Sequence, residues 1–348
     1  MNTTLKKQAQ KVAKAILFIA LFLLIYTYSR DVLRNKSESE ALGIIMKLEN
    51  EIYDVILAGP SHMQYAIQPA QLFAEYGIAA CNTSTAAQSI PTTYYVVKEM
   101  IDRHDPELVV LDLFCVFYPE VFFSPTRFHQ AIDNFPISVN KAQSILDLVE
   151  VSKSEFFVNY LLYHSRWKEL KRSDYTAHKD FNETYQLLAG TYPYANDFVP
   201  VDESEKSELP DISLEYLKKI VDLCKETDTR LLLTVIPYRA DIDNNDTSAI
   251  EQQKIYNRIA EYAKDWDVDY FNGLFHIDEI GFDFMTDMVE YSHVNSSGAQ
   301  KITTFYGKYF TDNYNLPDRS DDKNYDKWYD DYEEYLDKLF EIEIAAMQ

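Results

Sequence analysis

The sequence predicts an α/β protein of three layers, in which helices cover both faces of a parallel sheet. Short apolar runs of strand length alternate with longer segments of helical spacing along most of the chain. One run, residues 108–112, is continuously apolar until its final aspartate, as expected of a strand that is buried on both faces. Strands that alternate with helices pair in parallel, because each helix returns the chain to the edge where the previous strand began.

The individual elements follow from this alternation. The predicted strands are residues 54–58, 77–81, 108–112, 230–236 and 268–271. The predicted core helices are residues 61–76, 91–104, 214–225, 250–266 and 297–314. Pro69 interrupts the first helix, because proline has no N–H for the helical hydrogen bond, and Ser213 is expected to cap the third. Right-handed crossovers and this set of elements favour a flavodoxin-like strand order.

The N-terminal residues predict a membrane anchor. Residues 15–28 are uncharged and mostly apolar, and Lys6, Lys7, Lys11 and Lys14 precede them. Positive residues stay on the cytoplasmic side, so the chain is expected to be a single-pass protein of the cell membrane with its main domain outside. The run is shorter than the roughly 20 residues of a usual span, which leaves a cleaved signal peptide as the alternative. The residues after the run offer no cleavage site of small residues.

The rest of the chain divides into a stem, a main domain and a tail. The predicted segments are the cytoplasmic tail with the anchor at 1–29, the stem at 30–50, the α/β domain at 51–316 and an acidic tail at 317–348. Residues 114–201 break the alternation and are too long for an ordinary connection, so they are predicted to form an inserted helical cap near the site. The tail has the spacing of an amphipathic helix, which either packs on the domain or docks on a partner.

Composition excludes some classes of partner and cofactor. The formal net charge of −23 disfavours nucleic acid and anionic lipid surfaces, because both would repel the chain. The three cysteines, Cys81, Cys115 and Cys224, form no even disulfide set. The sequence has no cysteine and histidine spacing of a zinc site, and no metal or organic cofactor is expected.

Two residues that are far apart in the sequence have the chemistry of a nucleophile and a base. Ser61 follows the first strand in a Gly-Pro-Ser turn, and His293 precedes the last core helix. Glu290 and Asp287 both lie shortly before His293, so either carboxylate is a candidate to hold the histidine tautomer, with Glu290 favoured. The alternatives are a serine that only caps a helix and a histidine that is structural.

Further polar residues follow the predicted strands at the edge where a site would lie. Ligands of parallel sheets bind beyond the carboxyl ends of the strands. The substrate-binding candidates are those at this edge and two in the inserted segment: His62, Asn82, Gln88, Asp112, Tyr238, Arg166 and Trp167. Arg166 and Trp167 would hold an anionic group or stack on a sugar face, unless they are only a helix surface. Asp112 is equally suited to a buried structural role.

Three short segments around these residues resemble conserved sequence blocks of the SGNH (GDSL-like) hydrolase superfamily. The resemblance extends over residues 54–314. Residues 59–62 (Gly-Pro-Ser-His) resemble the first block of that family. Residues 290–293 (Glu-Tyr-Ser-His) resemble the last, with glutamate in place of the usual aspartate. Residues 82–88 look like the second block, and Ala87 stands at the glycine whose N–H helps to form the oxyanion hole.

The resemblance implies a role for each of these residues. Ser61 would attack an acyl carbonyl, His293 would be its base, and the backbone N–H groups of Ser61 and Ala87 would hold the oxyanion. The Gly-x-Asn-Asp of the third block is absent, and residues 112–116 (Asp-Leu-Phe-Cys-Val) occupy the matching strand end. The asparagine donor of the family is therefore missing.

A narrower resemblance takes the anchor into account. An N-terminal anchor, a Gly-x-Ser-His block and no third-block asparagine are similar to envelope-anchored SGNH-like proteins of bacteria, such as those of teichoic-acid D-alanyl transfer and of alginate and peptidoglycan O-acetylation. This implies an acyl esterase or O-acyltransferase that acts on a cell-envelope polymer, with an acylated polymer or acyl donor as partner and often beside a multi-pass membrane acyltransferase. The alternative is a catalytically degenerate binding partner of such an acyltransferase or polymer, because two oxyanion-hole features are altered.

Overall fold

The computed structural model describes most of the chain and divides it into two compact units. The described residues are 3–33, 53–117, 125–133, 135–136, 138–157, 163–175, 184–192, 200–239 and 247–346. The first unit joins Met1–Ser37 to Glu150–Phe181, and the second joins Glu38–Val149 to Asn182–Gln348. Most of the predicted stem and parts of the predicted cap lie outside the described residues.

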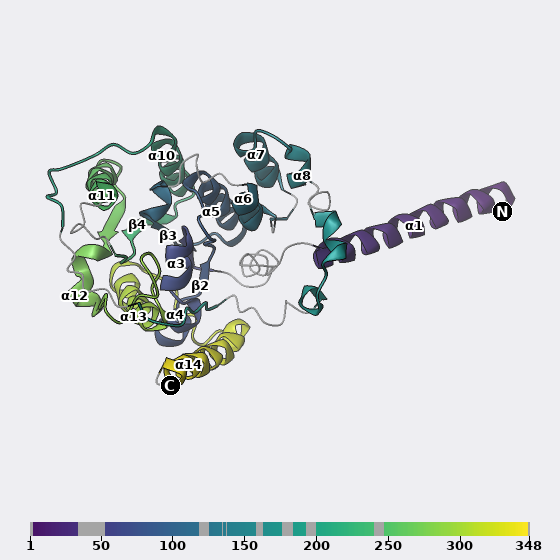
Figure 1. Ribbon diagram of the computed structural model, residues 1–348. Coiled ribbons are helices and arrows are strands. Elements are labelled where there is room, and N and C mark those ends of the chain that lie inside the picture. The colour runs from purple at the N-terminus through teal and green to yellow at the C-terminus, as the bar shows by residue number, and fades with distance from the viewer. Residues whose placement is uncertain are drawn as a thin grey trace. The chain divides into compact units, whose positions relative to one another are not determined.

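The second unit is built on a parallel sheet, which has five strands in the described part of the chain (Figure 1). Its strands are β1 Val55–Ala58, β2 Ala80–Asn82, β3 Leu108–Asp112, β4 Arg230–Val235 and β5 Asp269–Asn272. Their order is β2-β1-β3-β4-β5, and each neighbouring pair runs parallel. The predicted α/β class with a parallel sheet is confirmed, and each strand overlaps a predicted run.

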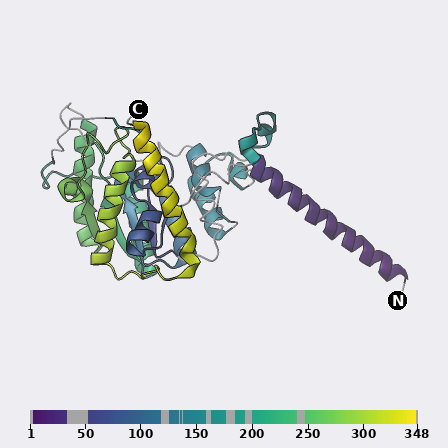
Figure 2. The same cartoon turned by 90° about the horizontal axis from the view of Figure 1, so that it is seen from below.

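Helices cover both faces of this sheet, as Figures 1 and 2 show. They are α3 Ser61–Ala66, α4 Pro69–Tyr76, α5 Ile90–His104, α10 Asp211–Glu226, α11 Thr247–Asp265, α12 Ile277–Ile280 and α13 Ser296–Asn313. α4 packs with α13 on one face, and α5 packs with α10 on the other. The core on the α13 side joins Leu57, Val110 and Leu232 of the strands to Ile302 and Tyr306 of α13.

Two local predictions about helix ends have different outcomes. The helix predicted to be interrupted at Pro69 is two helices, because Gln68 is extended and Pro69 begins α4. A proline ring drives the residue before it out of the helical region. The prediction that Ser213 caps α10 is wrong, because α10 begins two residues earlier, after Pro210. Ser213 lies inside the first turn, where its buried hydroxyl donates to the Val116 carbonyl at 2.7 Å.

The acidic tail forms a helix against the second unit. This helix, α14 Asp326–Ala346, packs on α4 and is the yellow helix of Figure 2. Trp328 and Tyr335 are buried, and the Tyr335 hydroxyl donates to Gln71 Oε1 at 3.0 Å. Of the two roles left open for the tail, packing on the domain is the one that these contacts show.

The long segment between β3 and α10 is divided between the two units. Helices α6 Pro125–Ile132 and α7 Val139–Leu148 belong to the second unit and pack against α5. Helix α8 Lys153–Phe157 and the 3-10 helices η2 His164–Lys168 and η3 Arg172–Tyr175 belong to the first. The role of this segment as a cap near the site stays a prediction.

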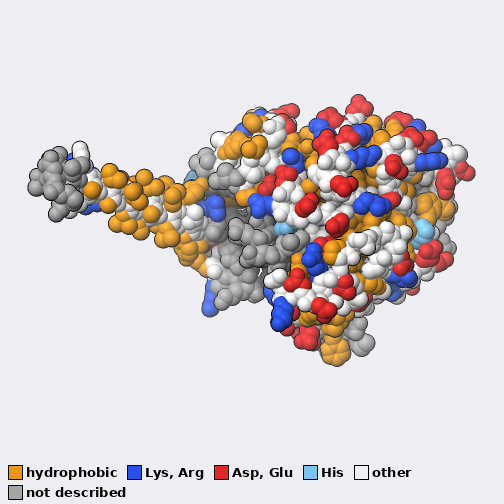
Figure 3. All heavy atoms as spheres, turned by 180° about the vertical axis from the view of Figure 1, so that it is seen from behind, with side chains coloured by type: hydrophobic (Ala, Val, Ile, Leu, Met, Phe, Trp, Pro, Cys, Tyr) orange, Lys and Arg blue, Asp and Glu red, His pale blue; other side chains and the backbone are white. Residues whose placement is uncertain are grey.

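One long helix, α1 Thr3–Leu33, begins the first unit. Within it, the 24 residues Lys7–Arg30 are long and apolar enough to cross a membrane. Apolar side chains cover the part of this helix that Figure 3 draws in colour, and they are exposed. This differs from the apolar stripe by which a helix packs on a protein core. By length and composition, α1 is therefore a candidate membrane span, longer at both ends than the predicted run of residues 15–28.

Candidate active site

Ser61 lies at the carboxyl end of β1, as the first residue of α3. The chain leaves β1 through Gly59 and Pro60 and then turns into the helix. Pro60 occupies the cap position, with an extended backbone and no side-chain capping bond. Ser61 is therefore not the cap of α3, which was the alternative explanation for a serine at this place.

Gly59 makes this turn possible. Its φ is +147°, a region that residues with a Cβ rarely adopt. A Cβ at this position would lie 3.0 Å from Asp112 Cβ and 3.4 Å from the Asp112 carbonyl oxygen, so Asp112 of β3 would have to shift slightly to admit it. The Gly59 carbonyl accepts a hydrogen bond from Gln88 Nε2 at 2.9 Å, which fixes the turn further.

Gly59→Ala is expected to destabilise the protein by roughly 1–3 kcal/mol, the usual cost of a sparsely populated backbone conformation, and by more if Asp112 cannot shift. Thermal unfolding of the full chain in detergent measures this change. Gly281→Ala is the matched control, because its φ is +70° but nothing lies within 4 Å of a Cβ there. Equal losses in the two variants would contradict the close packing of Gly59 on β3.

His293 joins Ser61 to a carboxylate. Its Nε2 lies 2.7 Å from Ser61 Oγ, although the two residues are 232 positions apart in the sequence. Its other ring nitrogen, Nδ1, is hydrogen-bonded to Glu290 Oε1. An ionised carboxylate only accepts hydrogen bonds, so Nδ1 carries the proton and Nε2 presents a lone pair to the serine hydroxyl. The three residues singled out in the sequence thus lie in one chain of hydrogen bonds.

A tight loop presents His293 and Glu290 side by side. The Val289 N–H donates to the His293 carbonyl at 3.0 Å and closes this loop. Ser292, which the sequence analysis missed, donates its hydroxyl to Glu290 Oε1 at 2.7 Å. Its place inside the Glu-Tyr-Ser-His block was the signal that could have identified it.

These hydrogen bonds keep Glu290 ionised. Burial alone would raise the pKa of its carboxyl, but the hydrogen bonds from Ser292 and His293 outweigh burial, and the pKa lies below its ordinary value. The stability that this carboxylate contributes is present above its unfolded pKa and is lost as the pH falls through the depressed folded pKa. At neutral pH, Glu290 is thus charged, and it could stabilise an imidazolium if Nε2 took a proton.

Asp287, the alternative acid, is engaged elsewhere. Its side chain is fully buried and accepts from Lys301 Nζ at 2.7 Å, from Ser297 Oγ at 2.8 Å and from the Asp283 N–H at 2.7 Å. These contacts tie the start of α13 to the segment before it. Glu290, and not Asp287, is the carboxylate on the histidine ring, a distinction that order in the sequence could not make.

His62, a substrate-binding candidate, is buried. Only 3% of its surface is exposed, its ring stacks on Phe114 with centroids 3.7 Å apart, and the Tyr238 ring centroid is 5.4 Å away. Among the described residues neither ring nitrogen has a hydrogen-bond partner, and Asp112 Oδ2 lies 4.0 Å from Nδ1. Burial, and then the neighbouring His293, lower the pKa of His62 well below its ordinary value, so its ring is neutral at pH 7.

Asp112 takes the structural one of its two expected roles. It is fully buried at the end of β3, and its Oδ1 accepts from the Phe114 N–H at 3.4 Å and the Ile236 N–H at 3.5 Å. Burial raises the pKa of its carboxyl to about 7, although these two N–H groups oppose the shift.

Asp112→Asn is expected to stabilise the protein at pH 8, and by a smaller amount at pH 5. Since the folded pKa is raised from 3.8 to about 7, the folded state binds more protons in this window, and wild-type stability falls as the pH rises through it. The neutral asparagine side chain keeps an oxygen that can accept from the Phe114 and Ile236 N–H groups, and it carries no charge that must be buried. Unfolding free energies from pH 5 to 8 measure the difference, whose slope is at most about 1.4 kcal/mol per pH unit. A difference independent of pH would contradict the raised pKa.

Three further substrate-binding candidates make structural contacts. Asn82 is buried, and its Nδ2 donates to the Met63 carbonyl at 2.9 Å, which ties β2 to α3. Gln88, also buried, supports the turn after β1. Tyr238 is fully buried, and its hydroxyl donates to Gln252 Oε1 at 2.9 Å. The sequence placed these residues at the correct edge of the sheet, but their side chains face inward and hold the site together.

Ala87 has a backbone conformation that favours glycine. Its φ is +48°, in the left-handed region, which costs a residue with a Cβ roughly 1–2 kcal/mol. This position therefore has a glycine-like conformation although its residue is alanine. Its N–H remains a candidate donor to an oxyanion.

Arg166 and Trp167 belong to the first unit. The Arg166 guanidinium pairs with Asp174 at 2.7 Å and also donates to the Leu33 carbonyl at the end of α1. The Arg166 guanidinium is thus engaged within its own unit, and its role in holding an anionic substrate stays a prediction. Trp167 is 65% exposed.

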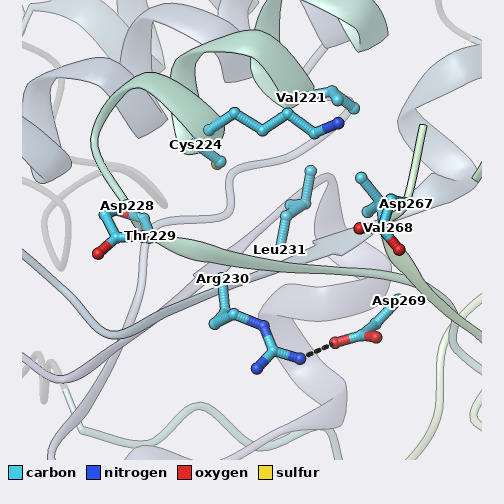
Figure 4. Close-up of a pocket in the computed structure, with 10 residues that line it drawn as sticks. Val221, Cys224, Asp228, Thr229, Arg230, Leu231, Asp267, Val268 and Asp269 are labelled. Carbon is cyan, nitrogen blue, oxygen red and sulfur yellow. Dashed lines mark hydrogen bonds and ion pairs between the residues drawn. The ribbon is translucent and has the colours of Figure 1, made fainter.

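A cavity of about 380 Å³ lies at the amino ends of β4 and β5 (Figure 4). Its lining includes Lys225, Asp267 and the ion pair of Arg230 with Asp269, 2.7 Å apart. This edge of the sheet is opposite to that of Ser61, so the cavity is not part of the candidate site. Among the described residues, no group of three or more His, Cys, Asp or Glu is arranged to hold a metal ion.

Comparisons with known proteins add a distant structural likeness. No protein-family model and no curated protein matches the chain. Among the solved structures that match is a crystal structure of a Bacteroides fragilis protein proposed to be an acylhydrolase. The match covers 80% of this chain and 98% of that one, with 10% sequence identity and a TM-score of 0.39. The proposal for the site therefore rests on its own geometry.

Proposed function

We propose that this protein is a membrane-anchored, extracytoplasmic SGNH-like serine esterase or O-acyltransferase. The observation that carries the proposal is the 2.7 Å contact of Ser61 Oγ with His293 Nε2, with Glu290 on the other ring nitrogen. A serine hydroxyl is a weak nucleophile until a base of fixed tautomer takes its proton. The strand order β2-β1-β3-β4-β5 supports the proposal of a flavodoxin-like sheet, and Ser61 follows β1 at the edge where parallel sheets carry their sites.

In the first half-reaction, His293 Nε2 accepts the hydroxyl proton of Ser61 while Oγ attacks the acyl carbonyl carbon. The carbonyl electron pair moves onto oxygen, and Glu290 stabilises the imidazolium. When the tetrahedral intermediate collapses, the bond to the leaving alcohol breaks. The alcohol oxygen takes the proton from Nε2, and the acyl group stays on Oγ.

The second half-reaction decides between hydrolysis and transfer. An acceptor hydroxyl gives its proton to His293 Nε2 and attacks the acyl-enzyme, and collapse then returns the proton to Ser61 Oγ. Water as acceptor makes the protein an esterase, and a glycan hydroxyl makes it a transferase. Both routes use only side chains and backbone groups of the chain.

The oxyanion hole is proposed to consist of the N–H groups of Ser61 and Ala87. The φ of +48° at Ala87 supports this, because the N–H is kept in a glycine-like conformation. The third donor of the family is replaced by Asp112, which is buried and accepts hydrogen bonds from the backbone. Loss of one such donor costs about 10²- to 10³-fold in rate, so a slower reaction than that of a complete site is expected.

The proposed substrate is an acyl group carried by, or destined for, a cell-envelope polymer. Anchoring through α1 keeps the site close to the membrane, where nascent polymers and a multi-pass acyltransferase would be reached. Protease added to intact protoplasts is expected to remove the domain that carries Ser61. Protection of that domain until lysis would contradict the outward orientation.

Turnover of acyl esters by the full chain in detergent tests the catalytic part of the proposal. The protein is expected to consume p-nitrophenyl acetate and acetylated polysaccharides. If it is a transferase, an added glycan acceptor is expected to receive the acyl group in place of water. The missing third donor of the oxyanion hole is the reason to keep an alternative, a degenerate binding partner. Polymer binding or co-purification with a membrane acyltransferase, without turnover of any ester, would support that alternative and end the catalytic proposal.

A further inference from the structure

We infer that residues 163–175, named the foot here, rest in the lipid headgroup layer at the C-terminal end of α1. The foot comprises η2 and η3 with their neighbours and belongs to the same unit as α1. This inference rests on the proposed membrane anchoring and not on the catalytic chemistry of Ser61.

The exposure of side chains changes abruptly along α1. Ile25 and Tyr28 are 64% and 65% exposed, whereas Val32 and Leu33 are 8% and 6% exposed. The change follows directly on the candidate span, which ends at Arg30. The side chains of the helix are thus exposed over the part that would lie in lipid, and those immediately after it are buried by protein.

The foot covers this end of the helix. Both η2 and η3 pack against α1, and the teal turns at the end of the purple helix in Figures 1 and 2 are this segment. The Arg166 guanidinium fixes the contact, because it donates to the Leu33 carbonyl and pairs with Asp174 of η3 at 2.7 Å.

The geometry sets the depth of the foot in the membrane. Leu33 lies three residues beyond Arg30, which is about 4.5 Å along a helix at 1.5 Å per residue. A bilayer is about 30 Å thick in its hydrocarbon core and about 40–45 Å thick with its polar regions, so each headgroup layer is roughly 5–7 Å deep. When Lys7–Arg30 spans the hydrocarbon core, a segment held at Leu33 therefore lies among the headgroups.

The exposed side chains of the foot suit this layer. Trp167 is 65% and Tyr175 is 53% exposed, and Lys168 Nζ lies 5.7 Å from the centroid of the Trp167 ring. Tryptophan and tyrosine concentrate at membrane interfaces, and lysine side chains near an anionic surface are attracted to it. The foot has more basic than acidic residues, in a chain of net charge −23: Arg166, Lys168, Lys171 and Arg172 against Glu169 and Asp174.

Depth-dependent fluorescence quenching tests the inference. The full chain is reconstituted into phosphatidylcholine–phosphatidylglycerol vesicles that contain lipids brominated either close to the headgroup or deep in the acyl chain. The shallow lipids are expected to quench part of the wild-type fluorescence more than the deep ones do. Trp167→Phe, which leaves the other two of the three tryptophans, is expected to remove that part. An unchanged quenching profile in Trp167→Phe would overturn the inference.

A charge-reversal pair tests the electrostatic contribution. Lys168→Glu with Lys171→Glu is expected to lower the shallow quenching at least twofold in vesicles with phosphatidylglycerol. Lys264→Glu with Lys323→Glu, at exposed positions of the second unit, makes the same change of net charge and is expected to leave the quenching unchanged. Equal losses in both pairs would show an effect of net charge alone and would overturn the assignment to the foot.

Extraction with alkaline carbonate separates this inference from the anchor. If the chain resists extraction and Trp167 is quenched by neither lipid, the anchor stands and the foot is wrong, as expected if a protein partner covers it. If carbonate extracts the chain, the anchor and the foot both fail. Ester turnover by Ser61 is independent of either result.

Discussion

Ser61→Ala is expected to lower the turnover of acyl esters by about 10⁴- to 10⁶-fold, since the acyl-enzyme has no other oxygen on which to form. His293→Ala is expected to cost about as much, because its Nε2 is the atom 2.7 Å from Ser61 Oγ that takes the proton. The double variant should lose little more than either single one, because the residues act as a unit. Initial rates of the purified full chains in detergent measure these losses.

Ser204→Ala is the matched control for the first of these variants. Ser204 is an exposed turn residue whose hydroxyl donates to Asp202 Oδ1 at 2.5 Å, and its loss should leave the rate unchanged. Thermal unfolding of each variant shows whether a lost rate reflects chemistry or folding. Wild-type rates in Ser61→Ala, or losses that simply add in the double variant, would refute a serine–histidine mechanism.

Glu290→Gln is expected to lower kcat by about 10⁴-fold, the effect seen when a triad carboxylate becomes an amide. The glutamine amide can turn an N–H toward His293 Nδ1, and the ring then carries its proton on Nε2, where it cannot accept one from Ser61. The rate, and not the stability, should show most of the change, because Glu290 is half exposed.

Asp287→Asn is the matched control for the acid. The buried Asp287 contacts Lys301 and Ser297, so its replacement should lower the unfolding temperature and leave kcat of the folded protein within a few-fold of wild type. A larger loss of kcat in Asp287→Asn than in Glu290→Gln would show that the acid has been assigned to the wrong residue.

The sheet and the hydrogen-bonded set of Ser61, His293 and Glu290 were predictable for the same reason. Strands buried on both faces, such as β3, are continuous apolar runs in the sequence, and the edge at which they end is fixed by their parallel direction. Ser61 follows such a run directly. Glu290 and His293 lie three residues apart just before a helix, whose cap, Asn295, accepts from the Gly298 N–H at 3.1 Å.

The direction of individual side chains was not predictable in this way. Asn82, Gln88 and Tyr238 stand at the correct edge, but each faces inward because a nearby backbone or side-chain group needs a partner. Arg166 donates a hydrogen bond to the carbonyl of Leu33, which is 133 positions away and could not be predicted from any local pattern. Ser213 looked like a helix cap. Its hydroxyl instead donates a hydrogen bond to a carbonyl of the 3-10 helix η1, Leu113–Phe117. Periodicity determines the element and its buried face, whereas these contacts depend on groups brought together only by the fold.

Covalent labelling with an alkyl fluorophosphonate tests the central claim most directly, because the reagent reacts with a serine that a neighbouring base activates. Intact-protein mass spectrometry of the full chain is expected to show a single adduct, and peptide mapping is expected to place it on Ser61. Labelling should be absent in Ser61→Ala and greatly slowed in His293→Ala. No adduct on the folded wild-type chain, or an adduct on another residue that persists in Ser61→Ala, would contradict the assignment of Ser61 as the nucleophile.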